Sequence, residues 1–496
     1  MAFYTEEICI TNDNIDEILS NTQSLTSIKL DFRLSAYNVA YLFDNDLTNL
    51  TLLNCGCNRS VVSIPVLSSL TTLYCNETLL HSIPLLPNLK ILICYNCVLL
   101  SEIPEFPNLE VLDCTRCYKL ISIPSFPNLT NLYCSRSKLL KNIPLLPRLK
   151  YLDCSGIDNI VSLPELMDLD TLHCTSCHNL EYLPDFPKLT YLNVSDTYNL
   201  NRIPKLNNLK ILICVGCIKL VEIPNYLVNL TKLDSSICSN LVKLPSLPNL
   251  QKLTCCKCIK LVSIPEFTNL TDINCNGCDK LTKISAQPNL LHLDCSHCNS
   301  LDNIPDLIYL QELNCDDCPK LKNIPILPNL TTLDCTWCKN LADLPILPRV
   351  EYLNCCGCKK IESIPLLTSL KILYCGWCDQ LKELAILPIL DKLECYRCHN
   401  LNKIPTFPKL TSLSCDTNID ISEIITLKLL NGREVVRQIK LEENMIIESD
   451  ECCSICLNSD DEKVYITKCK HPYHISCIKQ WVDMKNKSCP YCRQDL

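Results

Sequence analysis

The sequence predicts a solenoid of short repeats with a parallel β-sheet along its inner side, followed by a small metal-binding domain. Leucine, cysteine and proline recur at fixed positions about every twenty residues between residues 50 and 418. The chain has 41 cysteines and 30 prolines but only 7 glycines, and such a bias indicates an internal repeat. Eight cysteine and histidine residues then gather between residues 453 and 492.

The repeating unit reads L-x-x-L-x-C-x-x-C-x-x-L-x-x-I-P-x-x-P-N, and its first cysteine position marks nineteen units. The step between these positions is twenty residues, apart from one step of nineteen and one of twenty-one. This period is the signature of leucine-rich repeats at their shortest length. The first positions are Cys55, Cys75, Cys94, Cys114, Cys134, Cys154, Cys174, Val194, Cys214, Ser235, Cys255, Cys275, Cys295, Cys315, Cys335, Cys355, Cys375, Cys395 and Cys415.

Each part of the unit has a physical role. We expect L-x-x-L-x-C to form a short strand that pairs in parallel with its neighbours and points its leucines and first cysteine into the solenoid. The second cysteine stands where longer repeats use asparagine to tie one coil to the next, and a thiol is a small hydrophobe and a weak donor. Isoleucine-proline keeps the outer return extended. We therefore expect polyproline-like or 3₁₀ segments outside, and no outer helix.

About a dozen units carry C-x-x-C, a spacing that is also found in zinc sites and redox motifs. Where the pair is broken, the replacements are Val194, Ser137, Ile157 and Thr197. These side chains fill a similar volume but do not bind metal. No βαβ pattern or regular histidine accompanies the pairs, so we interpret them as packing positions without zinc.

Terminal repeats must be covered because they lack a neighbour on one side. Residues 1–49 are irregular, with an expected helix at Ile15 to Leu19 and an over-long unit from Leu25 to Asp46, and we interpret them as the N-terminal cap. Residues 419–450 form the C-terminal cap and linker. There, apolar residues on both sides of Asn431-Gly432 suit either a hairpin or two short helices.

The segment 451–496 holds the ligand-type residues at regular spacings. They read Cys-x-x-Cys, then Cys-x-His-x-x-His-x-x-Cys, then Cys-x-x-Cys. Zinc takes four thiolate or imidazole ligands in a tetrahedron, so eight ligands predict two zinc ions in closed, structural sites. The candidate ligands are Cys453, Cys456, Cys469, His471, His474, Cys477, Cys489 and Cys492.

This string resembles a RING finger of the two-histidine type, and the likeness extends to Tyr473 and Ile478. The resemblance implies a small α+β domain with interleaved ligands: Cys453, Cys456, His474 and Cys477 for one ion, and Cys469, His471, Cys489 and Cys492 for the other. It also implies that Ile455, Trp481 and Pro490 form the groove for a ubiquitin-conjugating enzyme. Arg493 would position ubiquitin, which suits the several donors of a guanidinium.

The resemblance implies a RING-type ubiquitin ligase in which the repeats bind a protein substrate and the finger recruits a ubiquitin-charged conjugating enzyme. No residue of the chain would be a catalytic nucleophile, because such a ligase acts by orienting the reactants. The layout resembles leucine-rich-repeat RING proteins of eukaryotes and of large DNA viruses. Two alternatives stay open: a non-enzymatic adaptor with a structural zinc finger, and a ligase for a ubiquitin-like modifier.

A candidate substrate surface lies in the last units, where aromatic residues and an arginine fall on inner-face or adjacent positions. Such side chains carry a large share of interface energy. The alternative is that they only cover the sheet. The residues are Trp337, Tyr352, Tyr374, Trp377, Tyr396 and Arg397. Asparagine and aspartate often precede the first cysteine, and we interpret them as a solvated face.

Charge and cysteine content suggest the compartment. The net charge of −8 argues against nucleic acid or an anionic membrane as the main partner. The chain starts MAFYTEEICITNDN, which lacks the features of a signal peptide. We therefore expect reduced thiols in a cytoplasmic protein, with the nucleus as a second location, and no secretion.

Overall fold

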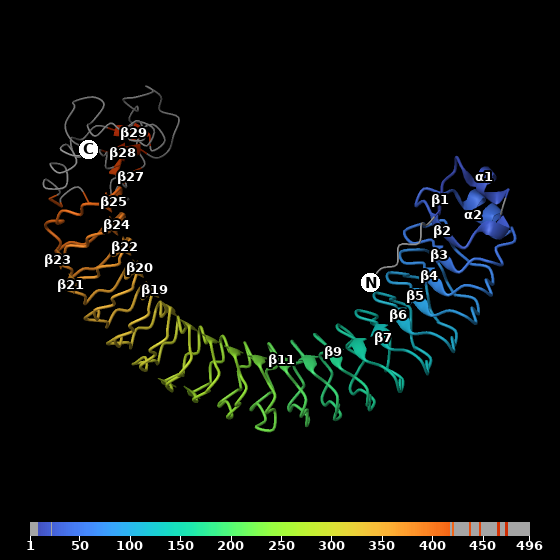
Figure 1. Cartoon of the computed structure of the whole chain (residues 1–496), viewed down its shortest axis with the longest axis horizontal. Coiled ribbons are helices and arrows are strands. Elements are labelled where there is room, and N and C mark those ends of the chain that lie inside the picture. The colour runs from blue at the N-terminus through green and yellow to red at the C-terminus, as the bar shows by residue number, and fades with distance from the viewer. Residues whose placement is uncertain are drawn as a thin grey trace. The chain divides into compact units, whose positions relative to one another are not determined.

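The computed structural model describes residues 8–20, 22–416 and 419–420, together with four short strands at 436–437, 446–447, 464–466 and 472–474. These residues fall into two compact units, 1–281 and 282–496, which are described separately. In each unit, strands from successive coils lie side by side in chain order (Figure 1). The predicted fold class, a solenoid of short repeats with an inner parallel sheet, is confirmed.

In the first unit, the inner sheet runs from the N-terminal segment through every repeat. Its strands are β1 (Ile8–Ile10), β2 (Ser27–Leu30), β3 (Leu52–Asn54), β4 (Thr72–Tyr74), β5 (Ile91–Ile93), β6 (Val111–Asp113), β7 (Asn131–Tyr133), β8 (Tyr151–Asp153), β9 (Thr171–His173), β10 (Tyr191–Asn193), β11 (Ile211–Ile213), β12 (Lys232–Asp234), β13 (Lys252–Thr254) and β15 (Asp272–Asn274). The outer strand β14 is Ser263–Ile264.

The second unit has the same construction. Its inner strands are β17 (His292–Asp294), β18 (Glu312–Asn314), β19 (Thr332–Asp334), β20 (Tyr352–Asn354), β22 (Ile372–Tyr374), β24 (Lys392–Cys395), β25 (Ser412–Cys415) and β26 (Val436–Arg437). Its outer strands are β16 (Lys283–Ile284), β21 (Ser363–Ile364) and β23 (Glu383–Leu384). β26 pairs in parallel with β25, so the sheet continues into the segment that we predicted as the C-terminal cap.

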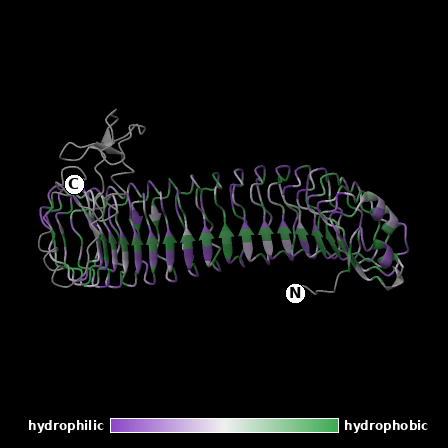
Figure 2. Ribbon diagram, turned by 90° about the horizontal axis from the view of Figure 1, so that it is seen from above, coloured by the Kyte–Doolittle hydropathy of each residue, from purple (hydrophilic) through white to green (hydrophobic). Residues whose placement is uncertain are grey.

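The register follows the sequence period. In β5 and β6, for example, Leu92 pairs with Leu112, and both side chains are fully buried. In β3 to β24, the residues on either side of the central leucine or isoleucine of each inner strand are half-buried or exposed on the inner face, as expected for a strand whose side chains alternate. Hydrophobic and hydrophilic segments accordingly alternate along the coils (Figure 2).

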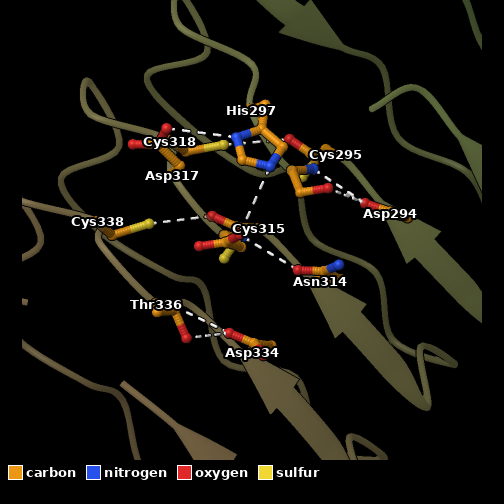
Figure 3. A network of polar contacts seen from close by, with 12 residues as sticks. Asp294, Cys295, His297, Asn314, Cys315, Asp317, Cys318, Asp334, Thr336 and Cys338 are labelled. Carbon is orange, nitrogen blue, oxygen red and sulfur yellow. Dashed lines mark hydrogen bonds and ion pairs between the residues drawn. The ribbon is translucent and has the colours of Figure 1, made fainter. Parts of the chain in front are cut away.

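The cysteines form the core together with the leucines. The first cysteine of each unit is buried, and burial, with Asp153 as a second cause, raises the pKa of the Cys134 thiol well above its usual range. The second cysteine donates a hydrogen bond to the carbonyl at the first position of the preceding unit. The Cys318 Sγ lies 3.1 Å from the Cys295 oxygen, and the Cys338 Sγ lies 3.1 Å from the Cys315 oxygen (Figure 3).

Other residues at the second-cysteine position explain what this position requires. Ser137 donates to the Cys114 carbonyl at 2.8 Å, and Asn58 donates to the Asp31 carbonyl at 2.8 Å. Position 58 thus uses the asparagine of longer repeats, at the junction with the irregular N-terminal coils. Ile157 is buried at the same position without a donor, so volume is the common requirement, and most of the other side chains there add a hydrogen bond within the dry turn.

The N-terminal segment contains the predicted helix α1 (Ile15–Leu19). A second helix, α2 (Ala36–Phe43), begins after Ser35, whose hydroxyl accepts a hydrogen bond from the Asn38 amide at 3.2 Å. This serine cap satisfies one of the free amides at the helix start. No helix in the described residues is long and apolar enough to cross a membrane.

The outer side of the repeats differs from one of our expectations. Between residues 50 and 416, the described chain has no helix, as predicted, but it has no 3₁₀ segment either. The described 3₁₀ helix, Thr22–Ser24, precedes the repeats. The outer returns consist of turns and extended chain, and β21 pairs in parallel with β23. Isoleucine-proline favours extended chain, which leaves these short coils no room for a helical turn.

Candidate functional site

A sharp turn follows each inner strand, and it determines where the candidate binding residues stand. The residue just before the second cysteine position has a positive φ in every described repeat, namely in fourteen non-glycine residues and four glycines. Trp337, Trp377 and Arg397 occupy this position with φ of 57°, 64° and 57°. The conformation is unfavourable for a side-chain-bearing residue, by roughly 1 to 2 kcal/mol. It is held by hydrogen bonds between coils, such as Trp337 N–H to the Cys356 carbonyl at 2.7 Å.

Four of the six predicted substrate-binding residues gather at these turns, and we call Trp337, Trp377, Tyr396 and Arg397 the turn cluster. The ring centroids of Trp337 and Trp377 lie 6.0 Å apart, and those of Trp377 and Tyr396 lie 6.3 Å apart, edge to face. The Arg397 guanidinium lies 4.3 Å from the centre of the Trp377 ring, within cation–π range. Trp337 is 37% exposed and the other three residues are half-buried, so the cluster is partly open to solvent.

The other two predicted residues, Tyr352 and Tyr374, lie on the inner face of β20 and β22. Their centroids are 5.7 Å apart in an edge arrangement. The Lys392 Nζ lies 2.9 Å from the Tyr374 hydroxyl and 3.0 Å from a Glu394 carboxylate oxygen. These hydrogen bonds, to Tyr374 first and then to Glu394, raise the pKa of Lys392. The six residues therefore form two groups, one on the turns and one on the strands.

The polar residues at the end of each strand are not simply solvated, contrary to our interpretation of the sequence. They are half-buried, and their side chains accept hydrogen bonds from the chain two residues ahead. Asp334 accepts from the Thr336 amide at 3.0 Å and from its hydroxyl at 2.5 Å (Figure 3). Asp294 does the same with Ser296, at 3.0 and 2.5 Å. These carboxylates close the turn that the next residues make.

One turn carries a group of charged side chains. The His297 Nδ1 lies 3.3 Å from an Asp317 carboxylate oxygen, and the Nε2 lies 3.7 Å from an Asp316 oxygen (Figure 3). Burial, with the nearby Asp334 as a second cause, raises the pKa of the Asp316 carboxyl, although His297 opposes this.

A second aromatic surface, which the sequence analysis missed, lies in the first unit. Tyr133, Tyr151, His173 and Tyr191 stand on four consecutive strands, β7 to β10, and we call them the tyrosine strip. Successive ring centroids are 4.7, 5.6 and 4.9 Å apart. The signal was present in the sequence, because each residue is first or last in its expected strand.

The metal-ligand segment contains a small antiparallel sheet. β28 (Val464–Ile466) pairs with β29 (Pro472–His474), and β27 (Ile446–Ile447) pairs with β28. The candidate ligand His474 is the last residue of β29, opposite Val464. The other predicted ligands and groove residues lie outside the described residues: Cys453, Cys456, Cys469, His471, Cys477, Cys489, Cys492, Ile455, Trp481, Pro490 and Arg493.

The donor set fits zinc. Six thiols and two imidazoles in this segment are soft nitrogen and sulfur donors, and two sets of four match tetrahedral coordination. In the described residues, by contrast, no group of three or more histidine, cysteine, aspartate or glutamate side chains is placed to hold a metal. That the repeat thiols bind no zinc stays a prediction, and their hydrogen bonds to carbonyls favour it.

Residues 451–493 match the protein-family model described as "Ring finger domain". This segment is a RING finger of the two-histidine type. Curated proteins are similar to the chain over short stretches. Brassinosteroid-responsive RING protein 1 of Arabidopsis thaliana is 36% identical over 66 residues, which are 12% of this chain and 39% of that protein.

Two further relatives share the same segment. RING-H2 finger protein ATL28 of Arabidopsis thaliana is 47% identical over 47 residues, 9% of this chain and 18% of the relative. E3 ubiquitin-protein ligase RNF13 of Homo sapiens is 39% identical over 46 residues, 9% of this chain and 12% of the relative. The chain thus spans well under half the length of these relatives.

The repeats are similar to a solved structure. YopM from Yersinia enterocolitica WA-314 superposes with a TM-score of 0.60 and 26% sequence identity, over 82% of this chain and 92% of YopM. This likeness agrees with the twenty-residue period of the sequence, and the repeats form a leucine-rich-repeat solenoid.

Proposed function

We propose that this protein is a RING-type E3 ubiquitin ligase whose repeats bind a protein substrate. The observation that carries the proposal is the RING finger at residues 451–493, together with its similarity to proteins named as E3 ubiquitin-protein ligases. The solenoid supports the second half of the proposal, because stacked repeats present long surfaces that suit protein partners.

In this proposal the finger binds two zinc ions. Cys453, Cys456, His474 and Cys477 hold one ion, and Cys469, His471, Cys489 and Cys492 hold the other. Zinc stabilises the fold of a segment too short to build a core of its own, and with four protein ligands it leaves no open coordination position.

The finger then recruits a ubiquitin-conjugating enzyme that carries ubiquitin as a thioester. Ile455, Trp481 and Pro490 provide an apolar groove for the enzyme, and Arg493 donates hydrogen bonds that position ubiquitin. The amine of a substrate lysine attacks the thioester carbonyl, an amide bond forms, and the thiolate of the conjugating enzyme leaves. The ligase contributes proximity and orientation, so this chain supplies no nucleophile.

The turn cluster is the proposed substrate surface. It offers two tryptophans, a tyrosine and an arginine in mutual contact, which are the residue types that dominate binding energy at interfaces. The cluster also belongs to the last repeats before the finger in sequence. A cytoplasmic location, with access to the nucleus, is part of the proposal. A reducing compartment, in which the cysteines stay as thiols, is part of the same proposal.

An autoubiquitination assay with a panel of charged conjugating enzymes tests the proposal. The wild-type chain should form ubiquitin conjugates with at least one enzyme. Ile455→Ala and Trp481→Ala should abolish transfer while zinc content stays unchanged, and Arg493→Ala should slow transfer more than it weakens binding of the uncharged enzyme. If all three variants keep full activity, or the wild type has none, the non-enzymatic adaptor becomes the better description.

A further inference from the structure

A polar groove crosses five successive repeats of the first unit, at the edge where the strands β10 to β15 begin. Its volume is about 760 Å³, and nine side chains line it: four asparagines, two lysines, two threonines and a glutamine. None of the nine is acidic, apolar or aromatic. The groove is therefore distinct in chemistry from the turn cluster and from the tyrosine strip.

The four asparagines of the groove form a ladder of side-chain amides with fixed orientations. The Nδ2 atoms of Asn208, Asn229, Asn249 and Asn269 donate to carbonyls of the preceding coil at 2.7, 2.8, 2.9 and 2.8 Å. Each amide is thereby held in one orientation, although its residue is exposed. A side-chain amide has two N–H donors and the ladder uses one, so a second donor remains for a ligand.

Positive charge accompanies these amides. Lys188 and Lys210 line the groove, and Lys188 forms an ion pair with Asp168 at 2.5 Å. No ion pair involves Lys210 in the described part of the chain, and the residue is exposed. Residues 188–269, which span the groove, contain ten lysines and arginines against four acids, a net charge of +6, in a chain whose total is −8. Charge of this sign attracts an anionic ligand.

We propose that this groove binds an extended acidic peptide segment, through lysine charge and a row of oriented amides. Carboxylates accept hydrogen bonds from both kinds of group, and charge strengthens these bonds. Five repeats at roughly 4.8 Å spacing cover about 19 Å, which matches about six residues of extended chain. Single-stranded nucleic acid fits less well, because the groove offers no aromatic side chain for stacking bases.

This inference rests on the proposed function in one respect: the acidic segment would belong to the substrate of the ligase. The groove would then define a substrate class for the ligase, namely proteins with an exposed acidic stretch. The RING finger itself does not specify a substrate.

The experiment measures binding of a fluorescein-labelled octaglutamate peptide to the full zinc-loaded chain by fluorescence anisotropy. Lys188→Gln combined with Lys210→Gln should weaken binding by about tenfold, since two charged contacts are lost. The matched control is Lys219→Gln combined with Lys243→Gln. It removes the same charge from the same basic stretch, at exposed positions that do not line the groove, and it should change affinity by less than about twofold.

Three results would contradict the proposal that this groove binds an acidic peptide. They are no peptide binding by the wild type, equal weakening in both double variants, or tighter binding of an eight-nucleotide oligothymidylate than of the peptide. Autoubiquitination of the wild type is measured in parallel. Peptide binding without conjugation would remove the ligase proposal and leave the groove as a binding site. Ubiquitin conjugation without peptide binding would remove the groove proposal and leave the ligase proposal standing.

Discussion

Trp337 and Trp377 lie two repeats apart, yet their ring centroids are only 6.0 Å from each other. Gly357 occupies the same turn position in the repeat between them. A Cβ atom at Gly357 would lie 2.5 Å from the Cε3 of Trp337, so the space that the rings share exists because this residue has no side chain.

Gly357→Ala should therefore displace Trp337 and open the turn cluster. The substitution also places a side chain at a φ of 72°, which costs roughly 1 to 2 kcal/mol of stability. Gly277→Ala is the matched control, because its φ is 71° but its nearest neighbour is the flexible Lys257 side chain at 3.1 Å. Both variants should lose stability in thermal unfolding, Gly357→Ala the more because the Trp337 ring must also move, and only Gly357→Ala should shift the tryptophan emission. If the two variants had equal emission spectra, the contact between Trp337 and Trp377 would not depend on Gly357.

Cys318 tests the role of the second cysteine in each repeat. Cys318→Ala removes the donor to the Cys295 carbonyl and leaves it unsatisfied in a buried turn, at a cost of about 1 to 3 kcal/mol. Cys318→Ser keeps a donor, as Ser137 does naturally, and should be the more stable of the two variants. Urea unfolding of both variants measures the difference. A more stable alanine variant would show that volume alone governs the position.

Zinc should be confined to the finger. Metal analysis should find about two zinc ions per full-length chain, and none in a chain that ends at Asp450. Cys477→Ala should release zinc and unfold the finger while the repeats keep their circular dichroism spectrum, because removal of one thiolate opens a structural site. Zinc bound to the shortened chain would contradict the packing role of the repeat cysteines.

Trp377→Ala combined with Arg397→Ala should lower ubiquitination of a bound substrate by about tenfold or more, because both half-buried residues belong to one contact group. Autoubiquitination should persist, since it needs only the finger and a nearby lysine. Tyr133→Ala combined with Tyr151→Ala, in the tyrosine strip of the first unit, is the comparison. If this second pair reduces substrate modification and the first does not, the turn cluster is structural and the substrate binds the strip.

We expect Asp316 to make the free energy of unfolding depend on pH. Because burial raises the pKa of this carboxyl in the folded state, its ionisation costs stability as the pH rises from the unfolded-state pKa through the folded-state pKa. Asp316→Asn should therefore be more stabilising near neutral pH than below about pH 4. The difference should stay within about 1 kcal/mol because the site is partly exposed and screened. Thermal unfolding at both pH values measures it, and the opposite trend would contradict the sign.

The sequence by itself determined the solenoid, the buried positions and the eight candidate ligands. A twenty-residue period repeated nineteen times predicts a solenoid, because each coil can bury its leucines and cysteines only against an equivalent coil. The ligand spacing is equally local, since Cys453 and Cys456 need only a short turn to converge on one ion.

The tertiary structure decided what depends on contact between coils. The sheet begins at Ile8, well before the first regular repeat, because β1 and β2 can pair in parallel without matching the repeat pattern. The left-handed turn that carries Trp337 and Trp377 follows from hydrogen bonds to the next coil, which a one-dimensional period does not encode. The contact across Gly357 and the amide ladder of the groove join residues about twenty to forty positions apart. Both features arise when the coils stack, so only the tertiary structure determines them.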